Sequence, residues 1–163
     1  MKFLLYAVVL AILFTVSGPA SSAERITIGG IENVILMPWE IALEARIDTV
    51  APTTCLEVRD LRVRDKMVEF RLPERYGGLQ LRLPLIGWLW SKTSDGPCQL
   101  RPAVELELWL GSVHLQAAVT LNDHSHMEYP VIIGWGTLDK GGFIIDVSRS
   151  YTSSPDCFKE LLP

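Results

Sequence analysis

The sequence lacks several features that mark common classes of protein. It has no basic stripe or arginine-rich run, and 15 basic against 19 acidic residues give a net charge of −4, which argues against nucleic-acid binding. It has no CxxC pair, no HExxH motif and no glycine-rich phosphate-binding loop with a lysine. We therefore expect no metal site and no cofactor.

Cysteine is scarce, with only Cys55, Cys98 and Cys157 in the chain. In an oxidising compartment two of the three could pair, and the third would then be free or would pair between chains. The sequence leaves open whether Cys55 pairs with Cys98 or with Cys157.

The first 23 residues have the pattern of a signal peptide. Lys2 gives a positive start, residues 3–16 are an almost unbroken apolar run, and small residues end at Ala23. A retained anchor is the alternative, but a run of this length is short of the roughly 20 residues that span a bilayer. We expect cleavage after Ala23, export of residues 24–163 as one domain, and no stable membrane span after cleavage.

Strand signals dominate the remaining residues. Apolar and polar side chains alternate over residues 104–110 and again over residues 113–121, on either side of Gly111-Ser112. This period of two around a short turn predicts a β-hairpin with one buried face.

Other segments predict further short strands, so we expect an all-β barrel or sandwich. Two wholly apolar runs, residues 131–133 and 143–145, are typical of strands buried on both faces. The predicted strands are residues 25–31 and 33–36, paired around Gly29-Gly30, and residues 41–47, 67–72, 131–133 and 143–145. Helical periodicity is almost absent, apart from one turn of helix that we expect within residues 157–162.

The stretch Pro-Leu-Ile-Gly-Trp-Leu-Trp at residues 84–90 is unusually apolar. A place in the core or in a subunit contact is favoured over a membrane-facing loop, because large exposed apolar patches are uncommon on monomers.

Ile47-Asp48-Thr49-Val50-Ala51 is a candidate catalytic loop, in which an apolar strand runs into Asp-Thr and small residues. By itself, an aspartate that starts a turn after a strand is the simpler interpretation. Later segments strengthen the interpretation of Asp48 as a catalytic residue. The order and spacing of motifs over residues 28–151 resemble those of the retropepsin-like aspartic peptidases. The closest resemblance is to a bacterial subgroup often labelled ATP-dependent zinc proteases. The supporting segments are Arg101-Pro102-Ala103-Val104, residues 121–134 with their Tyr129-Pro130-Val131-Ile132-Ile133-Gly134 end, Leu138, and Ile145-Asp146-Val147-Ser148.

The resemblance implies a small closed barrel of the retropepsin (acid protease) type over residues 24–163, in the periplasm or secreted. It implies a homodimer that cleaves a peptide or protein substrate, because a carboxylate site needs two acids sharing one proton and this chain has one Asp-Thr motif. Asp48 and Thr49 take the catalytic positions, and Thr49 ties the two loops together. The resemblance also implies that residues 74–78 form the flap that covers the substrate. The residues that it places in the substrate cleft or in support of the catalytic loop are Val50, Ala51, Ile132, Ile133 and Gly134.

Two residues depart from the family pattern. Val50 stands where the family has glycine, and its stiff branched side chain would narrow the cleft or shift the loop. Trp135 stands where the subgroup usually has arginine. These changes give the alternative hypothesis of a catalytically inactive peptide- or protein-binding module.

A metal-dependent hydrolase is a weaker alternative, based on Asp123, His124 and His126. Three mixed ligands from one loop fit zinc geometry poorly, so a polar surface loop is the preferred interpretation. No GxSxG motif supports a Ser-His-Asp triad.

Overall fold

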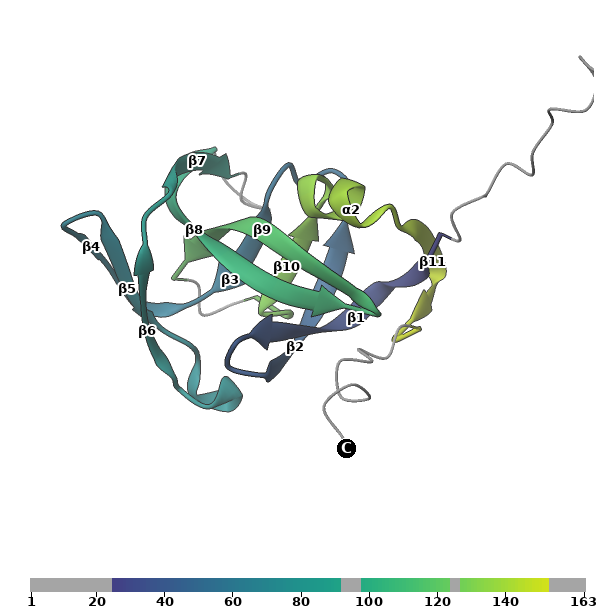
Figure 1. The fold of residues 1–163 in the computed structure, drawn as a ribbon, viewed down its shortest axis with the longest axis horizontal. Coiled ribbons are helices and arrows are strands. Elements are labelled where there is room, and N and C mark those ends of the chain that lie inside the picture. Colours follow the sequence, from purple (N-terminus) through teal and green to yellow (C-terminus); the bar gives the residue numbers. More distant parts are fainter. Residues whose placement is uncertain (1–24, 92–97, 124–126, 153–163) are drawn as a thin grey trace, which may run out of the picture.

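The computed structural model describes residues 25–91, 98–123 and 127–152, and most of them form strands (Figure 1). The elements are β1 (Thr27–Met37), β2 (Ile41–Asp48), β3 (Thr54–Glu57), β4 (Arg59–Arg64), β5 (Met67–Arg71), the 3-10 helix η1 (Glu74–Tyr76), β6 (Gln80–Pro84), β7 (Gly87–Ser91), β8 (Gln99–Leu110), β9 (Val113–Asn122), β10 (Val131–Gly134), α2 (Trp135–Gly141) and β11 (Ile144–Ser150).

The centre of the molecule is a closed six-stranded barrel, which confirms the expected all-β fold. Eight strands form one sheet in the order β11-β1-β2-β10-β3-β9-β8-β7, and an additional pairing of β1 with β8 closes the barrel. A separate three-stranded sheet, β4-β5-β6, lies beside the barrel (Figure 1). Without this closure, β1 and β8 would be the two edge strands of the six-stranded part of the sheet, so pairing them removes both edges.

The predicted hairpin is β8 and β9, joined by a turn in which Leu110 pairs with Val113. Gly111 has a φ of +60°, a value that glycine adopts without strain. The inward side chains of the hairpin are buried in the barrel core, and these residues are Val104, Leu106, Leu108, Leu115, Ala117, Val119 and Leu121.

Two strand predictions at the ends of the domain are wrong. Residues 25–36 do not form a pair of strands around Gly29-Gly30, because β1 runs on through both glycines with a register shift against β11. The run at residues 143–145 is not buried on both faces, because β11 is an edge strand on which Ile144 is 47% exposed.

A seven-residue helix, α2, follows β10 directly and was not predicted. It starts after Gly134 and ends where Gly142 takes the left-handed conformation. Two turns are too short to show a helical period in the sequence. The expected helical turn within residues 157–162 lies outside the described residues.

The flap assignment for residues 74–78 is not supported. These residues form η1 and its end, between β5 and β6. Arg75 Nη2 donates to Glu57 Oε2 at 2.6 Å, and Glu57 is at the end of β3 remote from Thr54. Since Thr54 is the β3 residue that adjoins the loop after Asp48, η1 packs at the wrong end of β3 to cover that loop.

Two further observations concern cysteines and membranes. Cys55 and Cys98 are both free thiols, the first buried and the second exposed, so the Cys55–Cys98 pairing is not formed; Cys157 lies outside the described residues. No helix in the described ranges is long and apolar enough to cross a membrane.

Candidate active site

Asp48 is the last residue of β2, and the backbone of the following loop holds its carboxylate. The N–H groups of Val50 and Ala51 both donate to Asp48 Oδ1, each at 3.0 Å. Asp48 Oδ2 lies 3.5 Å from Arg46 Nη2, and the Asp48 side chain remains 28% exposed. One oxygen is therefore fixed by the loop, while the other faces a cation and solvent.

The loop accommodates Val50 without backbone strain. Val50 has a negative φ, so this position does not require glycine in the single chain. Its side chain is 84% exposed and points away from the packed side of the loop. The N–H of Val50 donates to the carboxylate, so the loop keeps this bond with valine in place.

Strand β10 runs beside the Asp48 strand, as the resemblance implied. Ile133 is opposite Ile47 and Gly134 is opposite Asp48. A Cβ on Gly134 would be 2.6 Å from the carbonyl oxygen of Thr53 and 2.7 Å from that of Ala51. The loop after Asp48 therefore rests directly on the backbone of Gly134.

A buried pair of hydroxyls, which sequence reasoning missed, locks this contact. Thr54 Oγ1 lies 2.7 Å from Thr137 Oγ1 and also accepts from the Gly134 N–H at 3.2 Å. The Trp135 N–H donates to the Ala51 carbonyl at 2.9 Å. Thr54, the first residue of β3, was visible in the sequence beside the loop, but Thr137 had no signal because α2 was not predicted.

The outer side of β2 continues the polar site away from Asp48. Glu44, Arg46 and Asp48 alternate along the strand and share this side. The Tyr151 hydroxyl donates to Glu44 Oε1 at 2.6 Å, and this bond raises the pKa of Tyr151 to about 12. Ile132, which is opposite Arg46 on β10 and half-buried, supplies the apolar neighbour.

An open pocket of about 400 Å³ borders the loop on the Thr49 side. Its lining combines charged and aromatic side chains, and Trp135, one of them, is 51% exposed. The lining residues include Arg25, Thr49, Trp135, Leu138, Asp139 and Phe143. Thr49 is therefore at the surface beside a cavity, where another chain or a ligand has access.

Strand β8 contributes a buried cation near β3, and β7 contributes a hydroxyl beside it. Arg101 is 6% exposed; its Nη1 lies 3.9 Å from Cys55 Sγ and 3.4 Å from Ser91 Oγ. Arg101 Nη2 has no hydrogen-bond partner among the described residues. Burial raises the pKa of the Cys55 thiol, against the opposing effects of a hydrogen bond with Thr120 and the charge of Arg101.

The metal alternative gains no support in the described ranges. No group of three or more His, Cys, Asp or Glu side chains there is placed to hold an ion. Asp123 lies 3.4 Å from Arg59 in an ion pair, while His124 and His126 lie outside the described residues.

The loop presents one carboxylate, oriented by two amides, on an accessible surface. Such a group can accept a proton from water or donate one, but it cannot do both at once. A reaction that needs an acid and a base at the same time requires a second titratable group beside this one.

Comparison with known proteins adds independent information. A family model described as "RimB-like: Retropepsin-like aspartic endopeptidase RimB" matches residues 27–156. The crystal structure of a Legionella pneumophila protein of unknown function superposes with a TM-score of 0.69 at 21% identity, covering 80% of this chain and 100% of that one. At that identity the likeness concerns the fold alone. No curated protein matches the sequence.

Proposed function

Because this chain belongs to the RimB-like family of retropepsin-like aspartic endopeptidases, we propose that it is an exported aspartic endopeptidase. It acts as a homodimer in which the Asp48 carboxylates of two chains meet at the symmetry axis. The observation that carries this proposal is the geometry of Asp48: a carboxylate fixed by the Val50 and Ala51 amides and still partly exposed.

The chemistry follows from two carboxylates sharing one proton. Like charges held close together cannot both ionise, so one Asp48 takes a proton from the attacking water while the other donates to the substrate carbonyl. The amides that bind Oδ1 set the orientation of each group, which leaves Oδ2 to face water and substrate. Keeping these donors fixed avoids reorganisation when charge develops.

Arg46 is part of the environment of this pair. Its guanidinium lies 3.5 Å from Asp48 Oδ2 in the single chain. An exposed arginine at this distance makes a weak ion pair, so it can turn aside when the second Asp48 approaches. The supporting elements, β10 and α2, stay in place because their contacts to the loop are made by backbone and buried hydroxyls.

A second candidate function is a peptide- or protein-binding module without catalysis. The exposed side chains of Val50 and Trp135 favour it, since both present apolar surface beside Asp48. Two Val50 side chains brought to the axis with the two Asp48 groups would narrow the space for a scissile peptide. Binding without turnover would result.

Cleavage of a diverse peptide library separates the two functions. The endopeptidase proposal predicts cleavage with an acidic pH optimum by the unmodified protein, lost in Asp48→Asn. The asparagine carbonyl oxygen can still accept the Val50 and Ala51 N–H groups, so this variant keeps the loop and removes only the titrating acid.

Val50→Gly is the matched second variant. Cleavage that appears only in Val50→Gly, with library peptides still bound by the unmodified protein, would establish the binding module. Equal cleavage by the unmodified protein and Asp48→Asn would eliminate the enzymatic proposal.

A further inference from the structure

A single exposed face runs along the chain from β6 into β7. Every second residue from Gln80 to Trp90 is exposed and the residues between them are less so, as expected for one extended segment with two sides. The exposed side is polar at its start and apolar at its end. Its residues are Gln80, Arg82, Pro84, Ile86, Trp88 and Trp90.

The polar end of this face is cationic. Pro84 is opposite Met67, which is opposite Arg64, and the next row places Arg82, Glu69 and Arg62 side by side. Opposite residues in antiparallel strands share a side of the sheet, so Arg62 and Arg64 extend the exposed face. Neither takes part in an ion pair with a described residue, although Arg82 pairs with Glu69.

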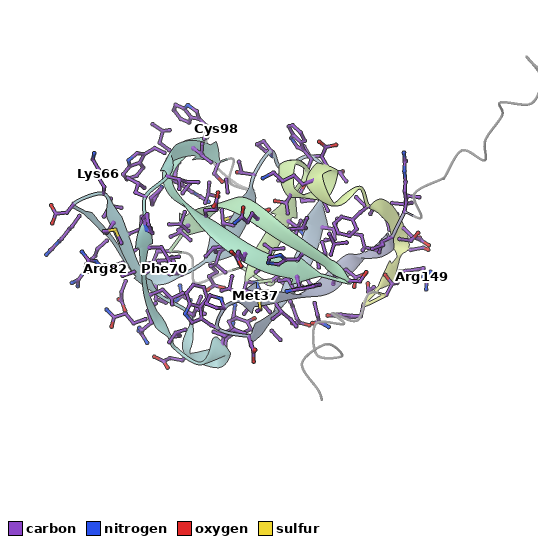
Figure 2. All side chains as sticks on the ribbon, in the orientation of Figure 1. Met37, Lys66, Phe70, Arg82, Cys98 and Arg149 are labelled. Carbon is purple, nitrogen blue, oxygen red and sulfur yellow. The ribbon has the colours of Figure 1, made fainter. Side chains whose placement is uncertain are left out.

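Lys66 lies between the polar end and the apolar end of the exposed face. It lies in the turn between β4 and β5, and its carbonyl accepts from the Leu85 N–H at 2.9 Å. Its exposed side chain also has no ion pair with a described residue. Figure 2 shows Lys66 and Arg82 at one end of the molecule, Cys98 along its upper edge and Arg149 at the other end.

The apolar end consists of two tryptophans that the described residues leave more than half exposed. Trp88 is 51% exposed and Trp90 is 63% exposed, and Leu100, which is opposite Trp90, is half-exposed. The predicted core position is therefore wrong for Trp88 and Trp90, although Leu85 of the same stretch packs against the core, and the subunit contact stays a prediction. Leu89 and its opposite residue Arg101 occupy the other side of the strands, and Arg101 contacts Cys55.

Charge is distributed unevenly along the chain. Residues 59–84 hold seven basic and four acidic residues, a net charge of 7 − 4 = +3. The whole chain has a net charge of −4. The cationic side chains and the exposed indoles lie next to each other on an otherwise acidic protein. Their complement is a partner surface with an anionic layer directly beside an apolar one.

We propose that this face, formed by Arg62, Arg64, Lys66, Ile86, Trp88 and Trp90 and called here the Trp–Arg face, docks the protein on an anionic phospholipid membrane surface. Indole rings favour the level of the lipid headgroups, where an apolar body and a polar N–H are both accommodated. Arginine and lysine beside them attract anionic headgroups and cover apolar surface with their stems. The tryptophans are on the opposite side of β7 from Leu89, whose opposite residue Arg101 contacts the buried Cys55.

Vesicle sedimentation tests the proposal with matched variants that all carry the same N-terminus. The protein is expected to bind vesicles of mixed phosphatidylglycerol and phosphatidylcholine, and to bind pure phosphatidylcholine vesicles much more weakly. Trp88→Ser/Trp90→Ser is expected to weaken binding by at least about tenfold, since two indoles lose their burial. Arg62→Gln/Arg64→Gln/Lys66→Gln is expected to abolish the preference for anionic lipid.

The controls are an exposed tryptophan and an exposed arginine outside this face. Trp135→Ser and Arg149→Gln are expected to bind as the unmodified protein does. Circular dichroism and thermal unfolding establish that each variant is folded.

Three outcomes would overturn the proposal. One is absence of binding to either vesicle by the folded protein, and another is equal binding by the Trp88→Ser/Trp90→Ser variant. The third is concentration-dependent self-association that this variant loses without any vesicle binding, which would make the face a contact between copies of the chain.

Discussion

At the scale of single residues, the orientation of Asp48 depends on backbone amides and not on the identity of residue 50. Both hydrogen bonds to Oδ1 come from N–H groups, and every residue except proline supplies one. Valine at residue 50 therefore leaves the Asp48 carboxylate in position. Its side chain affects only the solvent-exposed side of the loop. The absence of a side chain matters instead at residue 134, where a Cβ would meet the backbone of Thr53 and Ala51.

Gly134→Ala is expected to destabilise the protein by about 1–3 kcal/mol, because overpacking against a fixed neighbour must move one of the two. The added Cβ meets the backbone of Thr53 and Ala51, which cannot turn away as a side chain can. Urea unfolding measures the loss. Gly30→Ala is the control, since its Cβ would have no neighbour nearer than 3.8 Å; equal losses at both positions would contradict the packing account.

Thiol labelling tests the burial of Cys55. The thiolate is the reactive form, and burial raises the pKa of the Cys55 thiol. The folded protein is therefore expected to react with iodoacetamide at the exposed Cys98 and very slowly at Cys55. Peptide mass spectrometry after a short pulse gives the two rates, with urea-unfolded protein as the reference in which both react. Fast labelling of Cys55 in the folded state would show that β7 and β8 do not cover it.

At the scale of elements, strands with a clean period of two were predictable and the others were not. Alternation identified β2 and the β8–β9 hairpin because each has one buried and one solvated face. The run at residues 143–145 was misread because apolar composition does not distinguish a central strand from an exposed edge strand such as β11. Gly29 suggested a turn, yet it is a position where β1 passes close to the Arg149 carbonyl.

The candidate site was predictable in part, for a related physical reason. Asp48 and the strand at Ile132-Ile133-Gly134 have sequence patterns of their own, and the structure pairs them in register. Thr137 belongs to a helix of only seven residues, and its contact with Thr54 spans 83 positions in the chain. Such a contact forms only when the barrel closes, so no local sequence pattern predicts it.

The link between β3 and α2 predicts unequal effects of two similar substitutions. Thr54→Val removes the partner of both the Thr137 hydroxyl and the Gly134 N–H, whereas Thr137→Val removes one bond. We expect about 1–3 kcal/mol for a buried polar group left without a partner, with Thr54→Val the more destabilising.

Denaturant unfolding of the two single variants and the double variant measures this coupling. The double variant is expected to lose less than the sum of the singles, since they share one bond. Strict additivity would contradict the hydroxyl pair.

At the scale of the whole molecule, the barrel carries one Asp48 loop, and the family chemistry requires two. The family match over residues 27–156 covers almost all of the described domain, so the second loop is not expected from another part of the same barrel. The surface near Asp48 is suited to a second copy: Thr49 borders an open pocket, and Val50 and Trp135 are exposed. A symmetric contact would bring the same surface of each chain together.

Mixing the unmodified protein with Asp48→Asn tests the shared site most directly. The two forms are unfolded, combined at a constant total concentration and refolded, and peptide cleavage is measured as the proportion changes. If each site needs Asp48 from both chains, activity follows the square of the unmodified fraction, so an equal mixture retains about a quarter of the full activity. A linear fall, with about half retained in the equal mixture, would show that one chain holds a complete site and would contradict the account.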